Sequence, residues 1–198
     1  MAESQEFVGM GTAKRATYAD LDRTPEGDGK VYELLDGTVY VSPRPTGRHS
    51  VAQIELVRLL DRALGAGGQD AADAWSFASD VELRLGGDAL VPDIAAWRGP
   101  LPPTDARGYF DTPPAWVCEV LCPSNLRLDW SRKLPAYFRH GVQWVWLLDP
   151  RVEELHVLEM TGPGERFEGA PLEPIRPQPF GVPFDLGRLW TRLPTPRR

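Results

Sequence analysis

Apolar positions along this chain recur with two different periods, and these periods predict where its strands and helices lie. Two short apolar runs, Val31–Leu35 and Thr38–Val41, flank the pair Asp36-Gly37. An Asp-Gly pair between apolar runs favours a tight β-hairpin, because the turn needs residues that tolerate positive φ. The sequence therefore predicts a hairpin in the first quarter of the chain, after a short helix at Tyr18–Asp22.

Two longer segments have the period of an amphipathic helix. From Ser50 to Leu64 the apolar residues recur about every 3.6 positions, Ser50 and Gln53 form a candidate capping box, and Gly65 follows the last apolar position. A second helix is expected from about Asp129 to His140, where Gly141 ends it. Both helices have one apolar face and are expected to cover a sheet.

The remaining apolar runs predict strands, at Ser76–Leu85, Ala89–Trp97, Ala115–Leu121, Gln143–Leu148 and Glu154–Glu159. The run at Ala115–Leu121 is apolar throughout, which is typical of a central strand buried on both faces. The order of elements gives an α-β-β-β-α-β core, with a mixed sheet flanked by helices, and places the chain in the α/β class.

A proline-rich segment follows this core. Residues 161–198 hold eight of the 20 prolines, and we expect an extended tail anchored by Phe180, Phe184, Leu189 and Trp190. The length suits a single domain over 1–198, with the core at 21–159 and the tail at 161–198.

Composition narrows the class of protein without deciding its function. Hydrophobic residues make up 42% of the chain and the net charge is −6, which excludes general disorder. No apolar run is long enough for a membrane helix, and the first residues lack the apolar core of a signal peptide, so we expect a cytoplasmic protein. Cys118 and Cys122 do not have zinc-site spacing and are expected to be buried neutral thiols.

Two carboxylates stand out because each lies in an apolar context. Asp93 falls in the run LVPDIAAW and Glu119 in WVCEVL, where an ionised group is costly unless something compensates it. If the two strands are neighbours, these carboxylates can converge and, with the Val120 carbonyl, hold Mg²⁺. The alternative is that arginines pair with each acid.

Lys133 adds to this candidate site. Only three lysines occur among 22 cationic residues, and Lys133 lies four positions after Asp129, on the same face of the predicted helix. A lysine near an attacked phosphate can stabilise the charge that develops there. The alternative is an ordinary surface pair between Asp129 and Lys133.

Several cations could contact the phosphates of a nucleic acid. The candidates are Arg44, Arg48, Arg127 and Arg132. A charged helix face exposed to solvent is the competing explanation for the last two.

Taken in order, several motifs resemble the Uma-two family, whose members are described as restriction endonucleases within the PD-(D/E)XK nuclease superfamily. The motifs are YELLDGTVYVSP, His49, VPDIAAW, VCEVLCPSN, Asp129, Lys133, Tyr137 and GVQWVWLLDP, and they cover about Leu21 to Glu159.

The resemblance implies a restriction-endonuclease-like fold and a Mg²⁺- or Mn²⁺-dependent site that hydrolyses DNA. Asp93 and Glu119 would be the motif acids. The motif lysine would ordinarily stand at position 121, which is leucine here, so Lys133 is its substitute. Auxiliary roles would fall to Glu33, His49 and Asp129.

Two residues depart from the family pattern. Cys122 stands where serine is usual, and Pro135 interrupts the helix that carries Lys133; if that helix begins near Arg127, Pro135 would kink it. The first hypothesis is therefore a metal-dependent endonuclease that could act as a homodimer. The alternative is a catalytically weak or inactive module of the same fold that binds nucleic acid or a protein partner.

Overall fold

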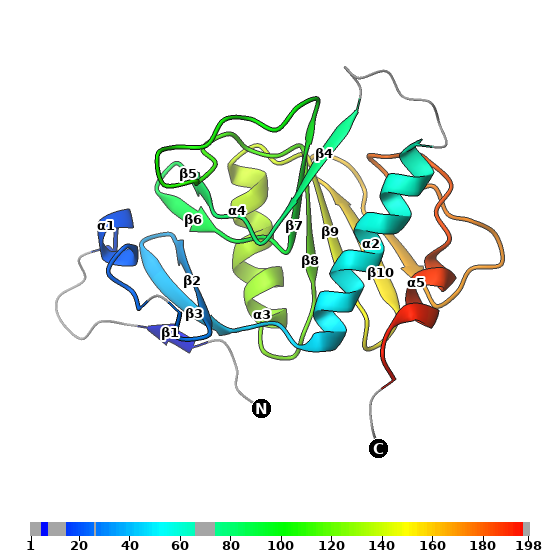
Figure 1. Ribbon diagram of the computed structural model, residues 1–198, viewed down its shortest axis with the longest axis horizontal. Helices are drawn as coiled ribbons and strands as arrows, with labels where there is room; N and C mark the ends of the chain where they lie inside the picture. Colours follow the sequence, from blue (N-terminus) through cyan, green and yellow to red (C-terminus); the bar gives the residue numbers. More distant parts are fainter. Residues whose placement is uncertain (1–4, 8–14, 26, 66–73, 196–198) are drawn as a thin grey trace.

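The computed structural model describes residues 5–7, 15–25, 27–65 and 74–195, and its strands form two sheets. The smaller sheet has the order β1-β3-β2-β6-β5 and the larger has the order β11-β10-β9-β8-β7-β4. Figure 1 shows the smaller sheet standing beside the larger one, with β2 and β3 at the left of the view. The mixed α/β class is confirmed, but the strands are divided between two sheets instead of one.

The smaller sheet contains the expected hairpin. Its strands are β2 (Lys30–Leu35) and β3 (Thr38–Pro43). Asp36 and Gly37 join them with φ values of 52° and 77°, as the turn requires. The other strands are β1 (Gln5–Phe7), β5 (Leu83–Leu85) and β6 (Asp88–Leu90). The short helix α1 (Tyr18–Leu21) also forms as expected.

The larger sheet carries the expected core. Its strands are β4 (Trp75–Ser79), β7 (Ile94–Arg98), β8 (Trp116–Val120), β9 (Trp144–Asp149), β10 (Glu154–Glu159) and β11 (Glu165–Glu168). β4, β7 and β8 pair antiparallel, whereas β8 and β9 pair in parallel. The carboxyl ends of β8 and β9 therefore lie at the same edge of the sheet.

Two predicted strands were wrong in their extent. The run Ser76–Leu85 is split into β4 and β5, and the run Ala89–Trp97 is split into β6 and β7, so that each run contributes to both sheets. Asp80, with a φ of 53°, interrupts the first run. Pro92, which has no N–H to donate to a ladder, lies at the break in the second. Both breaks lie beside Asp93.

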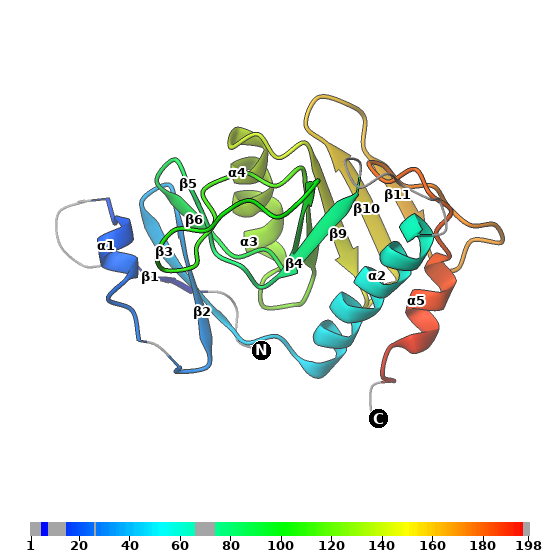
Figure 2. The same ribbon diagram turned by 45° about the horizontal axis from the view of Figure 1, so that its top comes forward.

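Helices cover the two faces of the larger sheet, as Figures 1 and 2 show. α2 (Gly47–Gly65) and α5 (Leu186–Arg192) lie on one face. On the other face, one continuous helical run comprises α3 (Leu126–Leu128), a π-helical turn η1 (Asp129–Lys133) and α4 (Leu134–Arg139). β8 serves both faces, because its successive side chains alternate between the two core clusters.

Both helices begin earlier than expected. α2 starts at Gly47, so Ser50 lies within its first turn, where its N–H donates to the Thr46 carbonyl at 3.0 Å, and the predicted capping box was wrong. Gln53 instead turns inward. The second helix begins at Leu126, three residues before the predicted Asp129.

The proline-rich tail is only partly extended. Its four predicted anchors are all buried in the core on the α2 face, but the tail also contributes β11 to the sheet and a short helix, α5, that packs on α2. No helix among the described residues is long and apolar enough to cross a membrane.

Candidate active site

The centre of the candidate site is the buried ammonium group of Lys133. Its Nζ lies 2.9 Å from Glu119 Oε1, 3.0 Å from Glu33 Oε1 and 3.9 Å from Asp129 Oδ1. It also donates a hydrogen bond to the Val91 carbonyl at 3.0 Å. The side chain is only 4% exposed, so Lys133 is not the surface lysine that the alternative interpretation expected.

The acids around Lys133 come from three separate parts of the chain. Glu33 lies in β2, Glu119 in β8, and Asp129 one helical turn before Lys133. Glu33 also accepts a hydrogen bond from the Val91 N–H at 2.8 Å. Lys133 therefore connects the smaller sheet, the larger sheet and the helix that covers it.

The helix around Lys133 is widened, and the widening accommodates Pro135. Residues Asp129–Lys133 form a π-helical turn in which the Leu134 N–H donates to the Asp129 carbonyl. Turns of this kind occur frequently at functional sites. Although the helix begins at Leu126, Pro135 does not turn Lys133 away from the carboxylates.

Asp93 lies at the other end of the site and is held by two donors. Its Oδ1 is 2.8 Å from His49 Nε2, and its Oδ2 accepts the Val120 N–H at 2.6 Å. Burial alone would lower the pKa of His49, but the hydrogen bond to Asp93 and the neighbouring Cys122 thiol raise this pKa to about 10. His49 is therefore a cation near neutral pH, and it neutralises Asp93.

The charge of Asp93, at one end of the site, affects the pKa of Glu119 at the other end. Burial raises the pKa of Glu119 to about 8, and the charges of Asp93 and Glu33 add to this effect, while Lys133 opposes it. The pKa of Asp129 is likewise raised well above its ordinary value, chiefly by burial and then by Glu119. Glu119 and Asp129 therefore hold a proton more readily than ordinary carboxyls, and a cation that binds here competes with those protons.

This donor set fits a hard divalent cation. Mg²⁺ is usually bound through one or two carboxylates and keeps several waters, and Asp93 and Glu119 are two carboxylates that repel each other across the site. Within the described part of the chain, no group of three His, Cys, Asp or Glu side chains forms a ready-made metal cage. Val120 presents its N–H to Asp93, and its carbonyl stays a predicted ligand.

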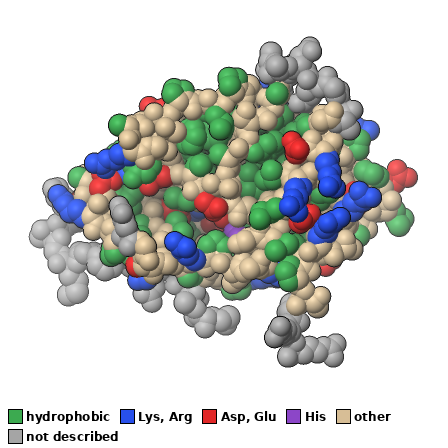
Figure 3. Space-filling view, viewed as in Figure 1, with side chains coloured by type: hydrophobic (Ala, Val, Ile, Leu, Met, Phe, Trp, Pro, Cys, Tyr) green, Lys and Arg blue, Asp and Glu red, His purple; other side chains and the backbone are tan. Residues whose placement is uncertain are grey.

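In the space-filling view, acidic and histidine side chains lie in a recessed area near the centre of one face (Figure 3). The four predicted DNA-contacting arginines differ in their exposure and contacts. Arg44, Arg127 and Arg132 are exposed. Arg48 donates to the carbonyls of Pro150, at 2.8 Å, and Pro194, so its guanidinium is engaged within the protein.

Sequence reasoning missed two polar contacts that hold the acids in place. The Tyr137 hydroxyl, fully buried, donates to Glu119 Oε1. The Gln53 amide donates to the Asp93 carbonyl and to Asp80 Oδ2, the latter at 3.1 Å. A glutamine on the apolar stripe of α2 was a signal of this contact, because a buried amide needs partners.

The two cysteines are both free thiols. Cys118 is buried, as expected, and burial raises its pKa well above the usual value. Cys122 is only half-buried, so the prediction of a buried neutral thiol was wrong for it. Burial opposes its ionisation, but the neighbouring His49 side chain and the Ser124 hydroxyl lower its pKa.

Comparison with known proteins agrees with this geometry. The model of the Uma2 family, described as "Putative restriction endonuclease", matches residues 16–178. The chain belongs to the Uma2 family. Among solved structures, this Uma2 chain is similar to a protein described as a putative nuclease belonging to DUF820 from Anabaena variabilis, with a TM-score of 0.71 and 22% identity over 88% of this chain and 97% of that one. No curated protein matches the chain.

The structural match confirms the restriction-endonuclease-like fold expected for a Uma2 protein. The roles of the individual site residues stay predictions.

Proposed function

We propose that this Uma2 protein is a metal-dependent endonuclease that hydrolyses phosphodiester bonds of DNA. The observation that carries the proposal is the position of Lys133, whose Nζ lies 2.9 Å from Glu119 in a site shared with Asp93. Two acids and a lysine held together at the end of a central strand supply both parts of phosphodiester hydrolysis, a cation ligand set and a positive group for the developing charge.

Each residue has a distinct task in this proposal. Asp93 and Glu119, with the Val120 carbonyl, would hold Mg²⁺ or Mn²⁺, which when bound supplies Lewis-acid polarisation of the phosphate. Lys133 stabilises the negative charge that develops on the phosphate oxygens during attack by water. Glu33 and Asp129 hold Lys133 in place.

His49 orients Asp93, and the surface arginines bind the DNA backbone. The protonated imidazole of His49 fixes the rotamer of Asp93 through their 2.8 Å contact. The exposed Arg44, Arg127 and Arg132 are available to the DNA backbone. These cations offset locally the net charge of −6 that would otherwise repel nucleic acid.

A cleavage assay tests the proposal. Supercoiled plasmid and single-stranded DNA are incubated with the protein in Mg²⁺, in Mn²⁺ and in EDTA. We expect cleavage only with a metal, loss of cleavage in Asp93→Asn and Lys133→Met, and unchanged cleavage in Lys30→Met, whose side chain is 52% exposed in a surface pair. Absence of cleavage by the folded wild type with either metal, or equal cleavage in EDTA, would contradict the proposal.

One observation favours a second candidate, a module that binds nucleic acid or a protein without cleaving. Lys133 is already engaged by two carboxylates and a carbonyl within 3.0 Å, which leaves little of its charge for a substrate. A binding-only protein would show no stabilisation by Mg²⁺ that depends on Asp93 and Glu119. Thermal unfolding with and without Mg²⁺ separates the two functions.

A further inference from the structure

Arg151 lies two residues after the end of β9, outside every motif considered above. β9 pairs in parallel with β8, with Val120 opposite Leu148, and the Leu121 N–H donates to the Leu148 carbonyl at 2.7 Å. The residues that follow β9 therefore emerge at the edge of the sheet where β8 delivers Glu119. In α/β sheets, ligands bind outside the carboxyl ends of such strands.

The guanidinium of Arg151 is held rigidly by Asp149. Asp149 Oδ1 accepts both the backbone N–H and Nε of Arg151 at 2.9 Å, and Oδ2 accepts the terminal nitrogen at 2.6 Å. Asp149 is only 8% exposed, whereas the Arg151 side chain is 37% exposed. One edge of the guanidinium is thus fixed to the protein, and part of it remains open to solvent.

The loop that carries Arg151 is also fixed to α2, the helix that carries His49. Arg48, the residue before His49 on α2, donates to the Pro150 carbonyl at 2.8 Å. The hydrogen bonds that Arg151 donates to Asp149 raise the pKa of Arg151, and the nearby Cys122 sulfur, which neighbours His49, adds to this effect. Arg151 therefore lies within electrostatic reach of the group that holds Asp93.

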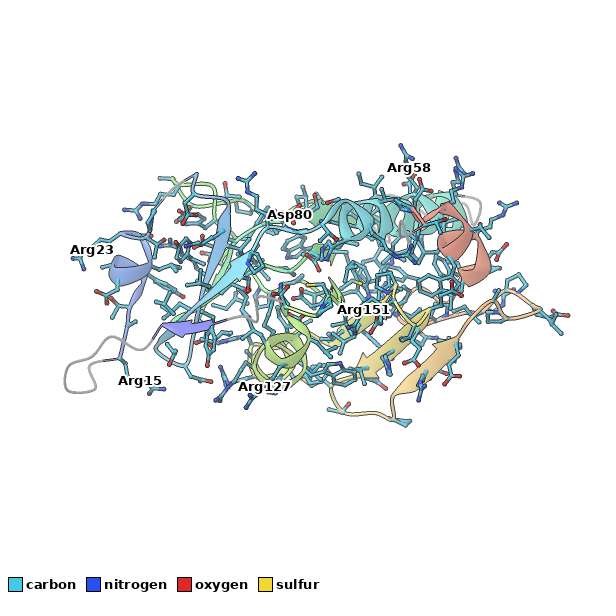
Figure 4. All side chains as sticks on the ribbon, turned by 90° about the horizontal axis from the view of Figure 1, so that it is seen from below. Arg15, Arg23, Arg58, Asp80, Arg127 and Arg151 are labelled. Carbon is cyan, nitrogen blue, oxygen red and sulfur yellow. The ribbon has the colours of Figure 1, made fainter. Side chains whose placement is uncertain are left out.

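Figure 4 shows the resulting placement. Asp80, Arg127 and Arg151 lie around the middle of the molecule, whereas Arg15 and Arg23 lie towards its left end and Arg58 lies along its upper edge in this view. A fixed, half-open guanidinium beside a phosphodiester site is suited to phosphate, since arginine presents paired donors in one plane. Its orientation is already set, so little side-chain entropy is lost on binding.

We propose that Arg151, oriented by Asp149, binds a backbone phosphate of the DNA next to the bond that is cleaved. The inference rests on the proposed function and adds to it a phosphate-binding residue on the β9 side of the site. Arg151 contacts the substrate backbone, and Asp149 is a positioning residue that acts through it. The contact is to phosphate, so it contributes affinity and salt dependence and not sequence preference.

The test is a binding titration with a fluorescein-labelled DNA duplex of mixed sequence, followed by anisotropy over a series of KCl concentrations with Ca²⁺ in place of Mg²⁺. Arg151→Ala is expected to weaken binding about tenfold and to reduce the slope of log K against log salt by about one. Arg151→Lys keeps the charge and is expected to keep the slope while losing part of the affinity.

Two further variants separate a phosphate contact from a structural effect. Arg58→Ala is the matched control, because Arg58, nine positions after His49 on α2, is 61% exposed and also pairs with a carboxylate, that of Glu55; it should bind as the wild type does. Asp149→Asn leaves the charge of Arg151 intact but loosens its orientation, and it should lower affinity without changing the slope.

The outcomes distinguish this inference from the proposed function. If the wild type binds DNA and Arg151→Ala matches Arg58→Ala in both affinity and slope, the inference is overturned while the proposed function stands. If the wild type binds no DNA, both fall. If Arg151→Ala proves unfolded by circular dichroism, Arg151→Lys decides, because unchanged affinity there would also contradict the inference.

Discussion

Replacing Lys133 by methionine removes a buried charge while conserving most of the side-chain volume. The substitution leaves Glu33, Glu119 and Asp129 without the ammonium group that now lies 2.9 to 3.9 Å from them. Breaking a buried ion pair from one side costs about 3–5 kcal/mol of the free energy of unfolding. We expect a loss of this size at pH 8 in EDTA.

The loss should depend on pH in a definite direction. The pKa of Glu119 is raised from 4.5 to about 8, so between these values the native state holds a proton that the unfolded state has released, and stability falls as pH rises. Without Lys133 this pKa rises further, so the fall extends to higher pH. At pH 5 Glu119 is protonated in the native state, so a smaller loss is expected than at pH 8, and the lost hydrogen bond to the Val91 carbonyl contributes about 1–2 kcal/mol of it.

Urea unfolding followed by circular dichroism at pH 5 and pH 8 measures both quantities. Lys30→Met is the control, because its surface pair should contribute less than about 1 kcal/mol at either pH. Adding Glu119→Gln to Lys133→Met removes one of the stranded carboxylates and should recover part of the loss at pH 8. An equal loss at both pH values, or a loss below about 1 kcal/mol at pH 8, would refute the reasoning.

Three other substitutions test separate parts of the structure. Asp93→Asn should abolish the rise in melting temperature that Mg²⁺ gives the wild type; an equal rise in both proteins would remove Asp93 from the metal site. Tyr137→Phe deletes the buried donor to Glu119 and should cost about 1–3 kcal/mol in urea unfolding, so an unchanged midpoint would contradict that contact. Gly37→Ala strains a turn with a φ of 77° and brings the new Cβ within 2.6 Å of Arg15; we expect a loss of about 1–2 kcal/mol, and a gain in stability would count against the described turn.

Local signals in the sequence predicted much of the fold. Asp36-Gly37 located the hairpin because its conformation is set by the two residues themselves. The apolar run around Glu119 predicted a central strand, because a strand buried on both faces is apolar throughout. Lys133 stood out because the chain has only three lysines. The α-β-β-β-α-β order followed from these runs.

Long-range contacts decided what the sequence could not predict. Pro92 is a local signal of a break in a strand, but only long-range pairing decides that the two parts of each run join different sheets. The spacing of Ser50 and Gln53 predicted a helix cap, whereas in the structure the Gln53 amide donates to the Asp93 carbonyl, a partner 40 residues away in the sequence. Asp149 and Arg151 lie near the site only because β8 and β9 pair in parallel, a pairing between segments more than 20 residues apart.

The central claim is that Asp93 and Glu119 together hold a divalent cation next to Lys133. Crystals of the wild type and of Asp93→Asn soaked in Mn²⁺, with anomalous diffraction recorded for both, test it most directly. The account predicts an anomalous peak between the Asp93 and Glu119 carboxylates in the wild type and none in the variant. A wild-type site without a peak at saturating Mn²⁺, or a peak that persists in Asp93→Asn, would contradict it.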